Sequence, residues 1–463
     1  MNNFKYFAAI TFILLYTSSC KKNEHQPPAV PPTPATLNTF AVRLLDTTTT
    51  TAGIAWTSAG DSTSNLVSYT IILDSSVVAS KVHGFSDSLV NLKPNTTHIV
   101  CVRAYNTAND SVTANLTFTT KDTYFTFMKS LSTSGMSYDV AITPGHGYLI
   151  PYMRSGDTFS VQNQIPLHLL KTDSMGNVLW TREYTDLYDA RNTQIKATTG
   201  GYLIRGWDYV IKVDSSGNIL WSTVFDSLAI VTTSMIITSN NNIVLSASGS
   251  GARSTSTAAV MELNSNGLIL WEKSFLNAPI GTTGNDVVES TSDNSLILLG
   301  SENNLFFVMK IDDQGNMVWK YDFGNGLASP AQMKMLNNQL LVGGFYVEQY
   351  YLSQMVTYRL DLNGQLLKTT LVGYPGGGTQ LTSLDLTQDA GYIINADIGT
   401  NSLSYVTLFK YDSADNLQWE IPYVDFEQCF AIHQTSDGGY VFAPFDGNAN
   451  IYLVKTNALG QPQ

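Results

Sequence analysis

The sequence predicts an all-β protein with a small N-terminal domain and a larger, repetitive C-terminal domain. Charged residues make up only 13% of the 463 residues, aromatic residues make up 11%, and there are 34 glycines. This composition favours strands and tight turns over helices. A short motif that ends in tryptophan recurs at intervals of about 48 residues, which is typical of architectures built from repeated β-sheets.

The N-terminus has the features of an export signal. Lys5 precedes the apolar segment Phe7–Tyr16, which is too short to span a bilayer as a mature helix, and Cys20 directly follows two serines. This arrangement resembles the signal of bacterial lipoproteins of the Bacteroidetes type. The resemblance implies a signal peptide over residues 1–19, acylation of Cys20, and a lipid anchor in the cell envelope at the outer membrane. An ordinary secretory signal with a chance cysteine is the alternative.

Residues 20–37 are predicted to form a Pro-rich linker, because five prolines fall within "KKNEHQPPAVPPTPATL". Proline-rich chain is extended and semi-rigid, so this segment is expected to hold the folded domains away from a membrane. The other cysteines, Cys101 and Cys429, fall in different predicted domains, so no disulfide is expected. Their spacing to histidines does not fit a metal site, and no metal is predicted.

Residues 38–121 are predicted to form a β-sandwich from short alternating strands. Trp56 ends the strand "AGIAW", and Leu92, Pro94, Thr96 and His98 stand two residues apart in "LVNLKPNTTHIV". This pattern resembles a fibronectin type III domain, with His98 in place of the corner tyrosine. The resemblance implies a domain that spaces or binds. The corner side chain is expected to donate a hydrogen bond to backbone.

The rest of the chain contains seven copies of a turn motif, most of which are followed by tryptophan. In "KIDDQGNMVW", for example, Asp312 and Gly315 precede Trp319. The first turn residues are Asp173, Asp214, Asn264, Asp312, Asp361, Asp412 and Asn457, and the tryptophans are Trp180, Trp221, Trp271, Trp319 and Trp419, with Lys368 at the fifth position. Each copy is flanked by an alternating stretch and two apolar strands. These repeats predict four strands in each unit.

Four strands in about 48 residues match a propeller blade, although a strand-rich solenoid is the alternative. The seventh unit stops at Gln463 before its fourth strand, and Phe125–Leu131 is left over at the other end, with Phe127 near the tryptophan position. Pairing this segment with the last unit would remove an exposed sheet edge. We therefore predict a seven-bladed β-propeller over residues 123–463, closed by an N-terminal strand.

The repeat unit also resembles a bacterial family with "DGGY" and "KLD-x-x-G-x-x-W" motifs, found in exported proteins. The clearest copy is "SDGGYVFAPF" (Ser436–Phe445), followed by "YLVKTNALG". The resemblance implies a propeller distantly similar to quinoprotein and Kelch propellers. It carries no catalytic motif and no cofactor onto this chain.

The aspartates of the repeated turns are predicted to be structural. An aspartate at the first turn position accepts hydrogen bonds from backbone amides two residues on, and glycine supplies positive φ. A calcium loop needs six to eight oxygen ligands, and most copies here offer one or two carboxylates. The residues assigned to structural hairpins are Asp173, Asp214, Asp312, Asp361 and Asp412.

Loops on one face of the predicted propeller carry aromatic side chains suited to a ligand. Loops that join the fourth strand of one unit to the first strand of the next share a face with loops that join second to third strands. The candidate ligand residues on this face are Phe159, Tyr188, Trp207, Tyr350 and Tyr351. Exposed aromatic residues suit protein or glycan contacts. The alternative is that they cap the propeller core.

The formal net charge of −12 argues against a nucleic-acid partner, because phosphate binding needs a basic face. No catalytic motif, phosphate-binding loop or cofactor motif is present. The sequence therefore favours an exported, lipid-anchored binding, adhesion or scaffold protein whose propeller binds a protein or a glycan. The alternatives are a glycan-active or quinone-dependent propeller enzyme and a structural subunit of an envelope complex. The oligomeric state stays open.

Overall fold

The computed structural model describes residues 37–60, 67–94, 96–120, 125–157, 165–188, 191–225, 230–249, 256–278, 282–290, 292–302, 305–312, 314–324, 327–347, 353–373, 379–400 and 403–462. These residues form strands and turns, and none of them forms a helix long and apolar enough to cross a membrane. The predicted signal peptide, Cys20 and nearly all of the linker lie outside the described residues. The chain divides into two compact units, Met1–Leu92 with Thr96–Thr120, and Lys93–Asn95 with Lys121–Gln463.

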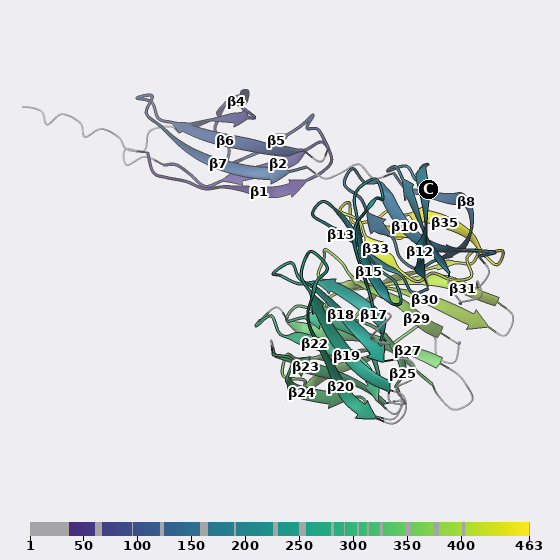
Figure 1. The fold of residues 1–463 in the computed structure, drawn as a ribbon. Helices are drawn as coiled ribbons and strands as arrows, with labels where there is room; N and C mark the ends of the chain where they lie inside the picture. The colour runs from purple at the N-terminus through teal and green to yellow at the C-terminus, as the bar shows by residue number, and fades with distance from the viewer. Residues whose placement is uncertain are drawn as a thin grey trace, which may run out of the picture. The chain divides into compact units, whose positions relative to one another are not determined.

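The small unit consists of two antiparallel sheets, drawn in purple and blue in Figure 1, with strand orders β1-β2-β5 and β4-β3-β6-β7. Its strands are β1 (Val42–Thr47), β2 (Ala52–Trp56), β3 (Ser68–Leu73), β4 (Ser76–Val82), β5 (Ser86–Leu89), β6 (Thr97–Tyr105) and β7 (Ser111–Thr119). Alternation along β2 and β6 places Ile54, Val100 and Val102 inside, where they are fully buried. The Tyr69 ring packs 5.4 Å from the Trp56 ring in this core.

The prediction that His98 donates to backbone is wrong. His98 is buried, but its Nδ1 atom lies 2.6 Å from a carboxylate oxygen of Asp74. The other oxygen of Asp74 accepts the Ile99 amide at 2.9 Å. The hydrogen bond from His98, then that from Ile99, holds the pKa of Asp74 below its ordinary value. The imidazole of His98 on β6 thus bonds to a side chain at the turn between β3 and β4 instead of to backbone.

The large unit contains the remaining strands. They are β8 (Phe127–Ser137), β9 (Ala141–Ile142), β10 (Tyr148–Arg154), β11 (Pro166–Thr172), β12 (Val178–Tyr188), β13 (Gln194–Thr198), β14 (Gly201–Arg205), β15 (Tyr209–Val213), β16 (Ile219–Val224), β17 (Ile230–Ile237), β18 (Ile243–Gly249), β19 (Ser256–Leu263), β20 (Ile269–Ala278), β21 (Thr283–Glu289), β22 (Leu296–Glu302), β23 (Leu305–Ile311), β24 (Met317–Asp322), β25 (Leu327–Leu336), β26 (Gln339–Val347), β27 (Ser353–Leu360), β28 (Leu366–Val372), β29 (Thr379–Leu386), β30 (Tyr392–Thr400), β31 (Leu403–Tyr411), β32 (Leu417–Tyr423), β33 (Ile432–Gln434), β34 (Tyr440–Phe442) and β35 (Asn450–Lys455).

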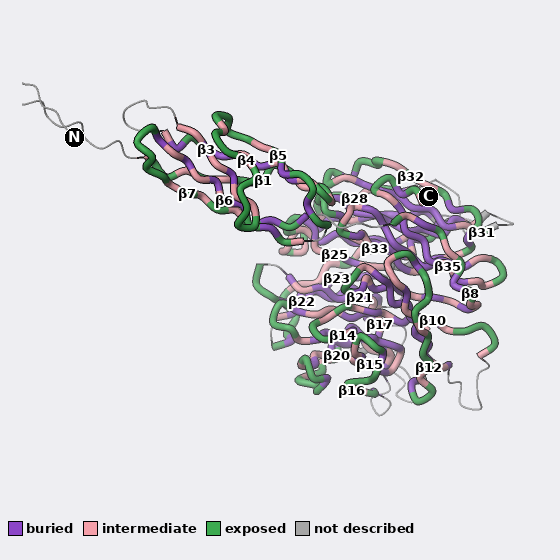
Figure 2. The backbone as a smooth tube through the Cα atoms, turned by 90° about the horizontal axis from the view of Figure 1, so that it is seen from above, coloured by how far each residue is buried: buried purple, intermediate pink, exposed green. Residues whose placement is uncertain are grey.

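Strands β13–β32 form five four-stranded sheets in sequence order, each an antiparallel meander. Apolar side chains fill the space between consecutive sheets, as Leu167 of β11, Ile195 of β13 and Tyr202 of β14 do in one cluster. Most consecutive sheets contact each other through their first strands, as β9 does with β13, β21 with β25 and β29 with β33. In Figure 2 most buried residues lie along the strands, whereas the connecting turns are largely exposed.

Strand β8 closes this series of sheets into a ring, the arrangement of a β-propeller. Figure 1 shows blue β8 beside yellow β35, although they lie near opposite ends of the large unit in sequence. Phe127 pairs with Lys455, just as Trp221 pairs with Lys212 in another sheet. This is the pairing expected for Phe125–Leu131. The strand is longer than expected, because its last residues also pair with β10.

The turn glycine of a hairpin packs closely on an aromatic ring of the preceding sheet. A Cβ atom on Gly217 would lie 2.9 Å from the Trp180 ring, too close for any side chain to be tolerated without movement. Gly217 also has a φ of 81°, which favours glycine. The same contact occurs where the ring closes, because a Cβ atom on Gly176 would lie 2.6 Å from the Phe127 ring. The glycine therefore serves packing between sheets as well as the turn.

One such contact is replaced by an ion pair. Lys368 stands at the tryptophan position of one hairpin, and Asp415 stands at the turn-glycine position of the next. The Asp415 carboxylate lies 2.8 Å from the Lys368 ammonium and 2.6 Å from the Arg359 guanidinium, and its side chain is only 2% exposed. Burial raises the pKa of Asp415, but the hydrogen bonds from Arg359 and Lys368 leave it below its ordinary value. Two departures from the repeat thus form one compensating contact.

We expect Asp415→Ala to lower the free energy of unfolding by about 3–5 kcal/mol, because it leaves the buried Arg359 guanidinium without its counter-ion. Chemical denaturation of the purified protein would measure the change. The control is Asp322→Ala, because Asp322 is 53% exposed and pairs with Lys320 at 2.8 Å. An exposed pair should contribute about 0–1 kcal/mol. Equal effects of the two substitutions would show that Asp415 does not hold these sheets together.

Candidate functional site

The first strand of each sheet in the ring is here called an inner strand, and five consecutive pairs of inner strands are joined by a hydrogen bond from backbone to side chain. Gln332 of β25 accepts the Leu384 amide of β29 at 2.9 Å, and Asp286 of β21 accepts the Met333 amide of β25 at 2.7 Å. The other acceptors, Asp139, Gln194 and Ser383, bond in the same way to the amides of Ile195, Met235 and Ile432. These five bonds define one equivalent acceptor position on the inner strands.

Two inner strands depart from this rule. Ser234 occupies the acceptor position of β17, but its hydroxyl donates to Asp286 at 2.5 Å instead of accepting the Val287 amide. Asp286 itself accepts that amide at 2.8 Å. Ala431 occupies the acceptor position just before β33 and has no side-chain acceptor to offer. At this second position Asp139 of the following sheet accepts the Val140 amide at 2.8 Å, so in both cases a carboxylate of the following sheet replaces the missing acceptor.

His433 bridges the point where the ring closes. Its Nε2 atom lies 2.8 Å from Asp139 and its Nδ1 atom lies 3.2 Å from Asp385. With a carboxylate at each ring nitrogen, both nitrogens act as donors and the imidazole is held in its charged form. Although burial lowers the pKa of His433, the charges and hydrogen bonds of Asp139 and Asp385 raise it to about 9.

The inner strands surround a polar cavity of about 330 Å³, here called the central cavity. Every sheet of the ring contributes to its lining. Its lining includes Tyr138, Lys196, Lys334, Phe345, Phe430 and His433. Amide and hydroxyl side chains such as Asn285, Gln380 and Thr382 supply much of the remaining surface. The centre of the ring is therefore a polar cavity and not a channel filled by apolar side chains, so it has room for a ligand.

Arg205 also lines the central cavity, but its guanidinium serves the fold. Its Nη1 atom donates to the Thr232 carbonyl at 2.7 Å, and its Nη2 atom donates to the Asn192 carbonyl at 2.5 Å. The side chain is 2% exposed, and burial lowers its pKa to about 10. Arg205 therefore ties β14 to the loop before β13 and to β17 through both of its terminal nitrogens.

Three aromatic side chains lie around the central cavity: Tyr138, Phe345 and Phe430. The Tyr138 and Phe430 rings are stacked with centroids 5.0 Å apart. None of them belongs to the candidate ligand residues named from sequence. Among those, Phe159, Tyr350 and Tyr351 lie outside the described residues, as does the side chain of Tyr188 at the end of β12.

The fifth candidate, Trp207, lies in the turn between β14 and β15 and is half-buried. The guanidinium carbon of Arg191 lies 4.4 Å from the centre of the Trp207 ring, a cation–π contact. The Trp207 carbonyl accepts the Thr232 amide at 2.7 Å. Trp207 is not among the residues that line the central cavity. Among the described residues, Trp207 contacts Arg191 and the Thr232 backbone, which is typical of a side chain that caps the domain core.

Asp397 of β30 is a second buried titratable group on the same part of the ring. Its side chain is buried, and the groups that interact with its carboxylate are the Cys429 amide and the Gln428 side chain. Burial raises the pKa of Asp397 to about 7, opposed by the Cys429 amide and the Gln428 side chain. Gln428 also lines the central cavity. Asp397 therefore changes protonation near neutral pH, one residue away from the cavity surface.

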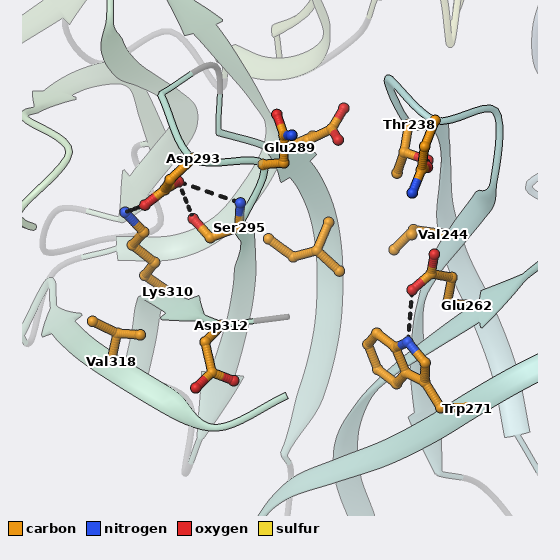
Figure 3. A pocket seen from close by; sticks show the side chains of 13 residues that line it. Thr238, Val244, Glu262, Trp271, Glu289, Asp293, Ser295, Lys310, Asp312 and Val318 are labelled. Atoms are coloured by element: carbon orange, nitrogen blue, oxygen red, sulfur yellow. Dashed lines mark hydrogen bonds and ion pairs between the residues drawn. The ribbon is translucent and has the colours of Figure 1, made fainter. Parts of the chain in front are cut away.

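A larger cavity of about 550 Å³ lies between the β17–β20 and β21–β24 sheets. Figure 3 shows the Asp293 carboxylate directed at Lys310 and Ser295, and the Glu262 carboxylate bonded to the Trp271 indole. The hydrogen bond from Lys310 and then that from Ser295 hold the pKa of Asp293 well below its ordinary value. Because its charged side chains are already engaged by hydrogen bonds within the protein, we do not assign this cavity to a ligand.

The turn aspartates lie away from both cavities or bond within their own hairpins. Asp312, for example, accepts the amides of Gln314 and Asn316 at 3.0 and 2.7 Å, and the Asn316 side chain at 3.1 Å. Asp173, Asp214, Asp361 and Asp412 accept the corresponding pairs of amides. The described residues contain no group of three or more side chains placed to hold a metal ion.

The inner-strand acceptors were not identified from sequence. A signal is present, because each acceptor stands directly before an apolar residue at the start of the alternating stretch, as in "TQIKATTGG" and "AQMKMLNN". Asp, Gln and Ser all fill this position, so no single letter repeats. The lysines of the central cavity follow two residues later, in the same two stretches.

No protein-family model matches the chain, and no curated protein matches it in sequence. Solved structures with a similar fold include the WD40 domain of Neurospora crassa Pan2, with a TM-score of 0.47 and 11% identity over 70% of this chain and 89% of that chain. The Dos1 propeller has a TM-score of 0.46 and 10% identity over 73% of this chain and 97% of that chain.

A quinonprotein alcohol dehydrogenase-like protein from Bacteroides thetaiotaomicron has a TM-score of 0.36 and 11% identity over 82% of this chain and 93% of that chain. These similarities concern the fold. The propeller assignment rests on the order of the sheets and on the pairing of β8 with β35.

The ion pairs of His433 should make stability depend on pH. Because the folded-state pKa is raised from 6.5 to about 9, their contribution is fully present below about pH 6.5 and is lost as the pH rises through 9. We expect His433→Gln to unfold at a lower temperature than the native protein at about pH 6, with the difference shrinking toward about pH 10. Thermal unfolding across this range would test this.

The control for this experiment is His83→Gln, because His83 is exposed on the small unit. It should leave the pH dependence of unfolding unchanged. A stability difference between the native protein and His433→Gln that is the same at every pH would contradict the charged-imidazole assignment.

Proposed function

We propose that the protein is an exported, lipid-anchored binding protein whose propeller binds a glycan at the central cavity. The observation that carries this proposal is the composition of the cavity lining, which combines amide and hydroxyl side chains with Tyr138, Phe345 and Phe430. Amide and hydroxyl groups both donate and accept hydrogen bonds, as sugar hydroxyls require, and aromatic faces pack against sugar rings. The cavity volume of about 330 Å³ is at the small end of the range for ligand sites.

A glycan fits this cavity better than a folded protein partner does. A specific protein interface buries on the order of 800 Å² on each partner over a broad surface. The central cavity is instead a recess that is enclosed by the inner strands of all the sheets. A chain end or single sugar unit can enter such a recess. The geometry therefore favours a glycan as the ligand, with a protein ligand on the surrounding loops as the alternative.

Binding is favoured over catalysis. The carboxylates that line the cavity, Asp139 and Asp286, each accept the amide of the following residue and one amide of the next inner strand. A glycosidase needs a pair of carboxyl groups free to exchange protons with substrate and water. Asp397, with a pKa raised to about 7, is the group on which an enzymatic alternative would rest.

We also propose that the ring has seven blades and that the small unit is a fibronectin type III-like spacer. The first half of β8 pairs with β35 and its last residues pair with β10, so the eight-stranded sheet divides into two blades beside the five four-stranded sheets. The three- and four-stranded sheets of the small unit, with Trp56 in the core between them, support the sandwich assignment.

Binding should be measured by titration calorimetry with the glycans selected from an array of neutral and acidic oligosaccharides. Phe430→Ala is expected to weaken binding about tenfold, because loss of an aromatic stacking face removes about 0.5–1.5 kcal/mol beyond its buried area. Phe125→Ala is the control, because Phe125 is 47% exposed and does not line the cavity. Absence of binding to any glycan, with the protein instead recovered in a stable envelope complex, would favour the structural-subunit alternative.

The anchor predicts a separate outcome. Lipidation at Cys20 should place the protein in the membrane fraction, and Cys20→Ala should release it into the soluble fraction. Cys101→Ala is the control, because Cys101 is a half-exposed free thiol of the small unit and should leave the distribution unchanged. Retention of Cys20→Ala in the membrane fraction would contradict the anchor.

A further inference from the structure

Two lysines of the central cavity stand at equivalent places on different sheets. Lys196 of β13 and Lys334 of β25 each follow the acceptor position of their strand, Gln194 or Gln332, by two residues. Side chains two apart on a strand point the same way, so both lysines project from the inner strands toward the cavity, which both of them line. Both are half-buried.

Neither of these ammonium groups has a hydrogen bond or an ion pair with the described residues. Other buried lysines of the large unit are paired: Lys310 with Asp293 at 2.7 Å, and Lys455 with Asp437 at 3.0 Å. A half-buried ammonium group without a partner is costly, because burial disfavours its charge. Burial, followed by the like charge of Lys334, lowers the pKa of Lys196, whereas Asp139, Asp286 and Asp385 raise it.

The balance of charge around the cavity favours a single negative charge in the ligand. The positive groups are Lys196, Arg205, Lys334 and His433, and the negative groups are Asp139, Asp286 and Asp385, which bonds to His433. Among these groups the positive charges outnumber the negative ones by one, in a chain whose net charge is −12, while burial disfavours the charged form of Asp397 behind the lining. The carboxylates are already engaged by His433 and by backbone amides, so the unmatched charge lies on the lysines.

We infer that Lys196 and Lys334 bind the monoanionic substituent of an acidic sugar, a carboxylate or a sulfate, at the centre of the ring. The inference rests on the proposed function and specifies its ligand. The lysines neutralise the anion as point charges, and the surrounding amide and hydroxyl groups bond to the sugar hydroxyls. A ligand anion between the two ammonium groups also removes their mutual repulsion, so binding should stabilise the cavity.

The experiment uses calorimetric titration of the full-length protein with matched sugars. Galacturonate is compared with galactose, glucuronate with glucose, and galactose 6-sulfate with galactose, and sodium acetate is the free-anion probe. The acidic sugars should bind at least tenfold more tightly than their neutral counterparts. The preference of carboxylate over sulfate, or the reverse, identifies the substituent. Binding should weaken as salt concentration rises.

Lys196→Met and Lys334→Met should each reduce affinity for the acidic sugar about tenfold to a hundredfold, as expected for loss of a hydrogen bond to a charged group. Neither should change affinity for the neutral sugar. Lys196→Arg should retain most of the binding. Lys212→Met is the matched control, because Lys212 lies on β15 of the same sheet as Lys196 and does not line the cavity.

A second measurement separates binding from folding. Because Met removes an unpartnered charge, Lys196→Met and Lys334→Met should unfold at the same or a higher temperature than the native protein when no sugar is present. A large loss of thermal stability in both variants would overturn the inference, because it would show that the lysines serve the fold.

The remaining outcomes are distinct. Equal binding of acidic and neutral sugars would overturn the charge selectivity and leave glycan binding intact. Binding of acetate as tight as that of every acidic sugar would overturn the sugar part of the inference. Absence of binding by every sugar and by the glycan array would overturn the proposed function as well.

Discussion

The large unit depends on two kinds of contact between each sheet and the next, one far from the centre of the ring and one close to it. On the outside, an aromatic ring packs on the turn glycine of the following hairpin, as Trp180 does on Gly217. On the inside, a side chain of one inner strand accepts an amide of the next, as Gln332 does from Leu384. Between these contacts lies an apolar core whose layers are continuous from sheet to sheet. Neither contact is made within a single repeat, so each repeat is stable only through its neighbours.

The pair formed by Lys368 and Asp415 shows that the outer contact, rather than any residue type, is what the fold requires. Loss of tryptophan at one hairpin and loss of glycine at the next, taken separately, look like two weakened repeats. In the structure they meet, and Arg359 completes a buried ion pair at 2.6 Å. Such a pair substitutes for the aromatic contact only because both charges are matched, since a single buried charge would be strongly destabilising.

The sequence predicted the all-β fold and the repeating hairpins because these depend on short patterns: a turn aspartate, a glycine with positive φ and a tryptophan at fixed spacing. The pairing of Phe127 with Lys455 could also be anticipated, because an incomplete last repeat and an unassigned first strand must be satisfied together. The central cavity could not be anticipated in this way. Its residues come from every repeat, and which of them face one another is decided only when the ring closes. His98 was misassigned for a related reason, since its partner Asp74 lies on another turn.

The inner strands also indicate where function can vary without loss of the fold. The acceptor positions are tied to the neighbouring sheets, and substitution there breaks a bond of the ring. Two residues further along, the equivalent positions are occupied by Ala141, Lys196, Ile236, Val288, Lys334, Asp385 and His433. No common chemistry links these side chains, so the ring does not demand one. His433 and Asp385 meet at the closure, but the two lysines bond to nothing in the described part of the ring. The two lysine charges lie at the centre of the ring and form no contact that stabilises the fold. They are therefore best explained as contacts to a bound ligand.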